Sequence, residues 1–335
     1  MQSSNDNDRD TLFTRRDALG LIGIGTLAGL SGSLPFSPVH ARAPMLGVPK
    51  TAFRRFSLGE FEVTIIRDGS KVISSPFAAF AADQFEEDVH ELLKANLLPV
   101  NRFELPYAPV VVNTREQLIL FDSGNGPARR PNSGHLVAGL AAAGYAPDQV
   151  DMVVITHCHP DHVGGLLEDG KRTFPNARYI CGGMEYDFWS NKSLLDGDPS
   201  IARRAKVVQA NVVSLAPRTT FIKNDGEVVS GIRAVFTPGH TPGHLAYHVE
   251  SKGKRMLIWG DAVVHFVISF QQPVWPLASD MDQEQAGATR RTLLDMAAAD
   301  KILVTGYHLP FPAIGYVEKY KGAYRFVPAS YQLNL

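Results

Sequence analysis

The chain has 335 residues, of which 44% are hydrophobic and 20% are charged, and its formal net charge is -1. This composition is ordinary for a globular protein with a full core. The near-neutral charge argues against nucleic-acid binding, which rewards clustered lysine and arginine, and the two cysteines, Cys158 and Cys181, do not indicate a disulfide framework.

Residues 1–43 have the layout of a twin-arginine signal peptide. Arg15 and Arg16 precede an apolar, glycine-rich stretch at 18–34, and small residues near position 41 offer a cleavage site. The apolar stretch is short for a bilayer span, which needs about 20 residues. An uncleaved membrane anchor is the alternative. We expect a periplasmic or secreted protein that is exported folded, with no stable membrane insertion after cleavage.

Residues 44–335 predict one domain in which short strands and helices alternate. Residues 44–55 look like a loose lead-in, and Asp68-Gly69 is typical of a turn. The expected strands are 61–66, 109–112, 117–121, 152–155, 178–181, 231–236, 245–249, 256–259 and 302–305. The expected helices are 82–97, 135–145 and 283–299, with a helical or irregular segment at 185–190. Several hairpins among these elements favour mixed sheets flanked by helices over a purely parallel sheet.

A dense cluster of polar side chains follows the strand expected at 152–155. Its members are His157, His159, Asp161 and His162. Imidazole nitrogen and carboxylate oxygen suit zinc and similar first-row divalent ions. Without a metal, so many polar groups at one strand end would be costly to bury. Cys158 lies between two of these positions, and we expect it to point away and pack as a thiol.

Three more candidate ligands follow apolar strands elsewhere in the chain. They are His240, Asp261 and His308, each preceded by a glycine within two residues, which permits close backbone approach. His244 is expected mainly to orient His240 rather than to bind metal. The sequence gives no metal-site context to the remaining histidines, and His248 and His265 in particular are expected to be packed or on the surface.

Together these residues resemble the metallo-β-lactamase superfamily, and more narrowly the branch that contains methyl parathion hydrolase and related lactonases. The resemblance runs from Phe56 to about Tyr331. Its other marks are Leu58–Thr64, Thr237–His244, His308–Pro312 and Tyr324–Pro328. It implies an α+β fold, a four-layer αββα sandwich of two mixed sheets flanked by helices, with two metal ions at one edge.

The resemblance also implies a set of metal ligands and a reaction. One ion would take His157, His159 and His240, the other Asp161, His162 and His308, and Asp261 would bridge the two. Zinc is the first expectation, with manganese, iron or cobalt as alternatives for the same donors. A hydroxide shared by the two ions would attack an ester or lactone carbonyl, with Asp161 and Asp261 as the catalytic residues.

Several alternatives remain beside this reading. A phosphotriester hydrolase could use the same site, and a homodimer stays open. A mononuclear iron oxygenase acting on persulfides would need fewer ligands than the sequence offers. A nuclease is disfavoured by the near-neutral charge, and a catalytically silent binding protein by the complete ligand set.

The substrate pocket is harder to predict. The first candidates are Trp189, Phe188 and Arg129, with Phe266, Phe270 and Trp275 as further aromatic side chains that could line an apolar pocket or pack in the core. The resemblance implies that relatives that cleave organophosphates carry an apolar aromatic residue in the loop that corresponds to the one after Asp122-Ser123-Gly124. Here that loop contains Arg129 and Arg130, which would suit an acidic substrate or simply face solvent. This difference favours a lactone or ester over a phosphotriester.

Overall fold

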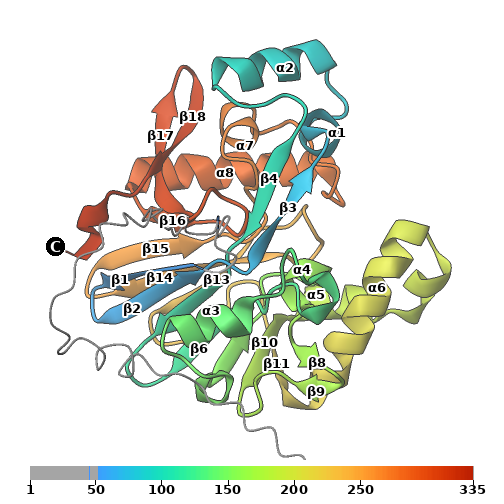
Figure 1. Ribbon diagram of the computed structural model, residues 1–335, viewed down its shortest axis with the longest axis vertical. Coiled ribbons are helices and arrows are strands. Elements are labelled where there is room, and N and C mark those ends of the chain that lie inside the picture. The colour runs from blue at the N-terminus through green and yellow to red at the C-terminus, as the bar shows by residue number, and fades with distance from the viewer. Residues whose placement is uncertain (1–44, 46–51, 335) are drawn as a thin grey trace, which may run out of the picture. The chain divides into compact units, whose positions relative to one another are not determined.

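Two seven-stranded mixed sheets form the centre of the molecule, for which a computed structural model describes residue 45 and residues 52–334 (Figure 1). In spatial order, the first sheet contains β1 (Phe53–Leu58), β2 (Phe61–Ile66), β5 (Val110–Asn113), β6 (Leu118–Phe121), β7 (Met152–Val154), β10 (Arg178–Gly182) and β11 (Thr219–Ile222). The second contains β12 (Glu227–Val229), β13 (Ile232–Phe236), β14 (Leu245–Ser251), β15 (Lys254–Ile258), β16 (Leu303–Thr305), β17 (Ile314–Tyr320) and β18 (Ala323–Pro328).

Two small hairpins and a set of helices surround these sheets. The hairpins are β3 (Gly69–Ile73) with β4 (Phe103–Tyr107) and β8 (Leu167–Glu168) with β9 (Lys171–Arg172). The α-helices are α1 (Pro76–Phe80), α2 (Glu86–Ala95), α3 (Leu136–Ala142), α4 (Pro160–Val163), α5 (Gly183–Ser190), α6 (Pro199–Asn211), α7 (Ile268–Gln271) and α8 (Gln283–Asp300). The 3-10 turns are η2 (Pro127–Arg129), η3 (Pro147–Gln149), η4 (Lys192–Asp196), η5 (Val213–Arg218) and η6 (Tyr331–Asn334).

The central strands β5, β6 and β7 of the first sheet are buried on both faces, which explains their continuous apolar sequence. Alternate residues of a strand point to opposite faces. In β5, Val110 and Val112 face the second sheet, and Val111 faces the helical layer that includes Leu136 and Leu140 of α3. The core therefore has one layer between the sheets and another between the first sheet and its helices.

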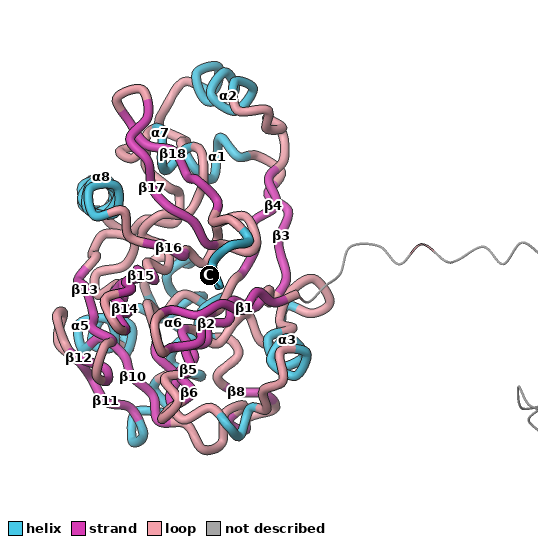
Figure 2. The backbone as a smooth tube through the Cα atoms, turned by 90° about the vertical axis from the view of Figure 1, so that its left-hand side faces the viewer, coloured by secondary structure: helices cyan, strands magenta, loops and turns pink. Residues whose placement is uncertain are grey.

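Helices cover the outer face of each sheet. Helices α3 and α5 pack on the first sheet, and α7 and α8 pack on the second (Figures 1 and 2). This arrangement confirms the αββα sandwich. The hairpin β3–β4 with α1 and α2 extends from one end of the sandwich, and its apolar cluster around Phe80 and Leu93 also includes Val264 and Ile268 of the segment that follows β15.

Most elements lie where the sequence predicts them, and the differences have physical causes. The helix expected at 82–97 begins only at Glu86, since residues 82–85 form a turn and the residue before the helix, Phe85, is in an extended conformation. The expected lead-in at 44–55 is partly strand, because residues from Phe53 onward pair with β2 along the sheet edge. Asp68-Gly69 is not a free turn, since Gly69 begins β3 and Asp68 is buried.

The predicted signal peptide at 1–43 lies outside the described residues. Residues 52–334 all belong to one compact unit. Among the helices of the described chain, none is both long and apolar enough to cross a membrane.

Candidate metal centre

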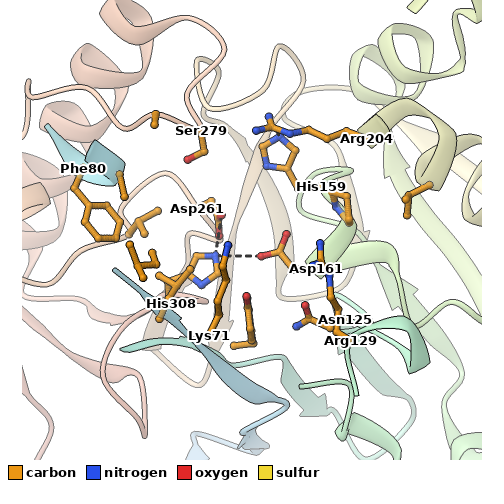
Figure 3. Close-up of a pocket in the computed structure, with 18 of the residues that line it drawn as sticks. Lys71, Phe80, Asn125, Arg129, His159, Asp161, Arg204, Asp261, Ser279 and His308 are labelled. Carbon is orange, nitrogen blue, oxygen red and sulfur yellow. Dashed lines mark hydrogen bonds and ion pairs between the residues drawn. The ribbon is translucent and has the colours of Figure 1, made fainter. Parts of the chain in front are cut away.

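Strand ends from both sheets bring the seven predicted ligands together. His157 follows β7, Asp261 follows β15 and His308 follows β16. Strands β15 and β16 are parallel neighbours, so the side chains after them emerge at the same edge. The loop after β7 turns into the short helix α4, which carries Asp161 and His162. Figure 3 shows Asp161 directed toward Asp261 and His308.

The seven side chains form two groups that could each hold a metal ion. One group is His157, His159, His240 and Asp261, and the other is Asp161, His162 and His308; within each group the ligand atoms lie within 4.8 Å of one another. Asp261 joins them. Its Oδ2 lies 3.4 Å from His240 Nε2 and 3.0 Å from His308 Nε2, and its Oδ1 lies 3.2 Å from His162 Nε2.

Three buried atoms in this centre indicate whether a metal ion would fit. His157 Nε2, His162 Nε2 and Asp261 Oδ1 are buried and have no hydrogen-bond partner in the structure. Buried polar atoms without a partner are costly and rare in native proteins. A divalent cation between these imidazole and carboxylate donors would satisfy all three, so the residues fit the metal that the donor set implies.

The two ligand groups differ in their electrostatic environment. Burial lowers the pKa of His157 well below its ordinary value, and the neighbouring His162 lowers it further. Burial also opposes protonation of His162, but the carboxylates of Asp261 and Asp122 outweigh it and raise the pKa of His162 well above its ordinary value. The first group therefore presents a neutral imidazole, and the second lies in a negative potential that attracts a cation.

The second nitrogen of several imidazoles is fixed by a neighbouring oxygen. Nδ1 of His162 lies 2.8 Å from Asp122 Oδ2, and Nδ1 of His240 lies 2.9 Å from Asp280 Oδ1. Nδ1 of His308 lies 2.8 Å from the carbonyl oxygen of Pro106. Such acceptors keep the proton on Nδ1 and leave the Nε2 lone pair facing the centre.

Sequence reasoning missed the roles of Asp122 and Asp280. Asp122 follows β6, which runs parallel to β7, and its carboxylate also accepts hydrogen bonds from the backbone N–H and hydroxyl of Thr156. The position of Asp122 at the end of a strand could have indicated this role from the sequence. Asp280 has no such signal, because it lies in a loop and is held by the fully buried Arg290 of α8 at 2.9 Å.

Glu185 connects the loops that carry the ligands. Its buried carboxylate accepts hydrogen bonds from the backbone of Cys158 at 2.7 Å and Gly243 at 3.0 Å, and from side chains of Thr241 and Trp189. Burial raises the pKa of Glu185. This carboxylate ties the loop after β7 to the loop after β13, and nothing in the sequence spacing indicated it.

His244 positions Asp261 rather than His240, which corrects the expectation. Its Nε2 accepts a hydrogen bond from the backbone N–H of Asp261 at 3.2 Å, and its Nδ1 lies 2.7 Å from the hydroxyl of Thr237. His265 is packed as expected, stacked on Phe103 with ring centroids 4.3 Å apart. Cys158 is a buried free thiol in the core of the first sheet.

A cavity of about 640 Å³ opens onto the centre. His159, Asp161, Asp261 and His308 lie on its floor, and Arg129 lines it as expected (Figure 3).

None of the five aromatic side chains considered from the sequence lines the cavity, so the prediction of Trp189 and Phe188 as pocket residues is wrong. Trp189 is fully buried against Glu185, and Phe188 packs against the same core cluster, so neither lines the cavity. Phe270 is fully buried in the core between the sheets, Phe266 lines a different pocket and Trp275 packs beside the α1–α2 cluster. The aromatic side chains that line the cavity are Phe80 and Tyr107 instead. They come from α1 and β4, elements that the sequence reading had not connected with the site.

Comparison with known proteins decides the family. The family model described as the metallo-beta-lactamase superfamily matches residues 104–306, more than half of the chain. The chain belongs to the metallo-β-lactamase superfamily. The model spans the cluster at 157–162 as well as His240 and Asp261, and it stops two residues before His308.

Relatives within the superfamily include lactonases. An N-acyl homoserine lactonase of Bacillus thuringiensis is 23% identical over 236 residues, which cover 64% of this chain and 86% of the relative. The lactonase AttM of Azorhizobium caulinodans is 30% identical over 191 residues, covering 54% of this chain and 66% of the relative. These relatives confirm the lactonase-like branch.

Solved structures agree with this placement. AidC, a dizinc quorum-quenching lactonase solved with N-hexanoyl-L-homoserine as product, has a TM-score of 0.78 at 27% identity, covering 84% of this chain and 99% of AidC. The hydrolase AbOPH of the same superfamily has a TM-score of 0.77 at 28% identity, with 83% and 98% covered. Family membership, lactonase relatives and the ligand groups identify this protein as a metal-dependent hydrolase.

Proposed function

We propose that the protein is a two-metal hydrolase that opens the ester bond of a lactone. The observation that carries this proposal is the pair of ligand groups joined by Asp261 at the floor of the cavity. The lactonase relatives support a lactone, of the N-acyl homoserine kind, as the substrate class. AidC, a dizinc enzyme, supports zinc as the metal.

Seven residues would hold the metals. His157, His159 and His240 suit one ion and Asp161, His162 and His308 the other, with a carboxylate oxygen of Asp261 available to each. When bound, two divalent ions lower the pKa of a shared water toward neutrality and polarise the oxygen that gains charge in the reaction.

The protein's own side chains would orient the substrate and exclude water. Asp161 is the ligand most open to the cavity, with 25% of its side chain exposed, so its free oxygen can align the attacking water. Tyr107 borders the same cavity, and burial together with Asp161 raises the pKa of its phenol. Tyr107 therefore keeps its proton and can donate a hydrogen bond to a substrate oxygen.

A substrate panel tests the proposal. The zinc-loaded protein would be assayed with N-hexanoyl-homoserine lactone, an aryl acetate and an aryl phosphotriester. We expect the highest kcat/KM for the lactone. Preference for the phosphotriester over every lactone would support the alternative reaction at the same site, and oxygen consumption with one iron per chain would support the oxygenase.

We propose further that the protein works outside the cytoplasm. The twin-arginine run at Arg15 and Arg16 and the apolar stretch after it support this location. Fractionation of cells that express the full chain tests it. Recovery in the periplasm is expected for the natural sequence, and recovery in the cytoplasm when both arginines are replaced by lysine.

A further inference from the structure

We propose that the natural substrate carries a negatively charged group, such as a carboxylate, which binds a cationic rim around the cavity. The rim consists of Lys71, Arg129, Arg203 and Arg204. This inference rests on the proposed lactone hydrolysis and adds the chemical class of the substrate. The lactonase relatives do not supply it, because an N-acyl homoserine lactone carries no charge.

Separate elements of the fold bring the rim together. Lys71 lies on β3, Arg129 ends the turn η2, and Arg203 and Arg204 are neighbours on α6. Figure 3 shows Lys71, Arg129 and Arg204 directed from three sides toward the space around Asp161. Residues distant in the sequence thus contribute positive charge to one cavity.

The rim residues have no acidic partner in the part of the chain that the structure describes. No carboxylate of residues 52–334 lies within 4.0 Å of a rim nitrogen, although other arginines do form ion pairs. The contrast is sharpest for adjacent residues. Arg130 pairs with Glu168 at 2.7 Å, whereas Arg129 beside it faces the cavity unpaired. The charge of Arg129 is therefore available to a ligand.

The charge of the cavity differs from that of the whole chain. The chain is nearly neutral at -1, but four cations line this cavity against two carboxylates, Asp161 and Asp261. Both carboxylates belong to the ligand groups. Their charge would be balanced by bound metal, so the rim would attract an anionic substrate.

Arg204 is a rim cation that is partly buried and has no acidic partner among the described residues. Its only hydrogen bond among the described side chains joins Nη1 to Nε2 of His159 at 3.2 Å. A partly desolvated guanidinium without an acidic partner gains a charge-assisted hydrogen bond when a carboxylate binds.

The opposite wall of the cavity is apolar. Ile73, Phe80 and Val264 line it, and Figure 3 shows Phe80 across the cavity from Arg204 and Arg129. The reacting bond would lie between the two walls, beside Asp261 and His308. A substrate with an apolar arm on one side and an acidic group on the other matches both walls.

A matched pair of lactones tests the inference. The probes are γ-butyrolactone and its 5-oxotetrahydrofuran-2-carboxylate derivative, assayed with the zinc-loaded protein at low and high salt. We expect kcat/KM to be at least tenfold higher for the carboxylate at low salt, mainly through KM, and this advantage to shrink at high salt. Equal rates, or preference for the neutral lactone, would overturn the inference.

Two arginine variants separate the rim from general surface charge. Arg129→Gln should raise KM for the carboxylate lactone about tenfold more than for the neutral lactone. Arg130→Gln, the matched control, should keep the wild-type ratio, and Lys71→Gln provides a second rim variant. Equal losses for both lactones in Arg129→Gln would contradict the inference.

The two proposals fail in different ways. If no lactone, neutral or charged, is hydrolysed by the metal-loaded protein, the proposed function is wrong. If neutral and charged lactones are hydrolysed equally well, lactone hydrolysis stands and the anion-binding rim is wrong.

Discussion

In the metal centre, His162, His240 and His308 are buried and the Nδ1 of each is held by an oxygen atom, whereas at the rim of the cavity Lys71 and Arg129 are exposed and have no acidic partner among the described residues. The centre is fixed by the ends of sheet strands, and the rim comes from a hairpin, a turn and a helix around them. In the proposed function, the fixed geometry of the centre would serve the reaction, and the charge on the surrounding elements would select the substrate. Substitutions in the metal centre, in its supporting network and beside the rim test this division.

Removing the shared ligand should have the largest effect. Asp261→Asn leaves a neutral amide where both ligand groups meet, so we expect a loss of at least ~1000-fold in kcat/KM, in line with the several kcal/mol that metal ions supply. Removal of the metal from the wild-type protein with a chelator should lower kcat/KM by a similar factor. Metal content and lactone turnover check both, and full turnover by metal-free protein would contradict the account.

Weakening the hydrogen bond that holds one ligand should have a smaller effect. Asp280→Asn weakens the hold on His240, and we expect metal affinity to fall by roughly 10–100-fold. Titration of the apoprotein with zinc measures this loss. Asp282→Asn, which alters only the residue capping α8, is the matched control and should keep wild-type affinity. Equal affinities in all three proteins would show that Asp280 does not orient the ligand.

Glu185, which links the loop after β7 to the loop after β13, should contribute to the stability of the protein. Glu185→Gln replaces two of the carboxylate's acceptor positions with an amide group that cannot accept the same bonds, so we expect the free energy of unfolding to fall by about 2 kcal/mol. Denaturation in urea measures the change. A variant as stable as wild type would mean that the network around Glu185 contributes no net stability.

The smallest effect should come from the paired surface arginine. Arg130→Gln breaks an exposed ion pair with Glu168, and such pairs contribute less than about 1 kcal/mol; it also removes the hydrogen bond from Nε of Arg130 to the carbonyl oxygen of Gly134 at 3.0 Å. The same urea measurement should detect little change. A loss above that value would show that Arg130 holds the loop of Arg129 in place, and the rim would then depend on more than its own charges.

The sandwich and its ligand cluster could be predicted from the sequence because short sequence patterns indicate both. Apolar strands followed by histidine or aspartate mark strand ends, and His157–His162 lie on one short segment. Distant ligands such as Asp261 and His308 follow strands of the same kind. Parallel pairing then brings the carboxyl ends of these strands to one edge of the sheets, and this can be predicted from the order of the strands in the sequence.

The walls of the cavity could not be predicted in the same way. Trp189 was expected beside the substrate, but its indole nitrogen bonds to Glu185 in the core, and no spacing in the sequence shows that partner. Tyr107 and Phe80 line the cavity because the hairpin β3–β4 and α1 extend from the sandwich beside the metal centre. Such placements depend on tertiary packing rather than on local pattern.

The central claim is that two metal ions, held by groups that share Asp261, enable the protein to hydrolyse lactones. Zinc titration of the apoprotein, with N-hexanoyl-homoserine lactone hydrolysis as the readout, tests it most directly. The account predicts that activity rises until two zinc ions are bound per chain and then stays constant. Full activity at one ion per chain, or activity independent of zinc, would contradict it.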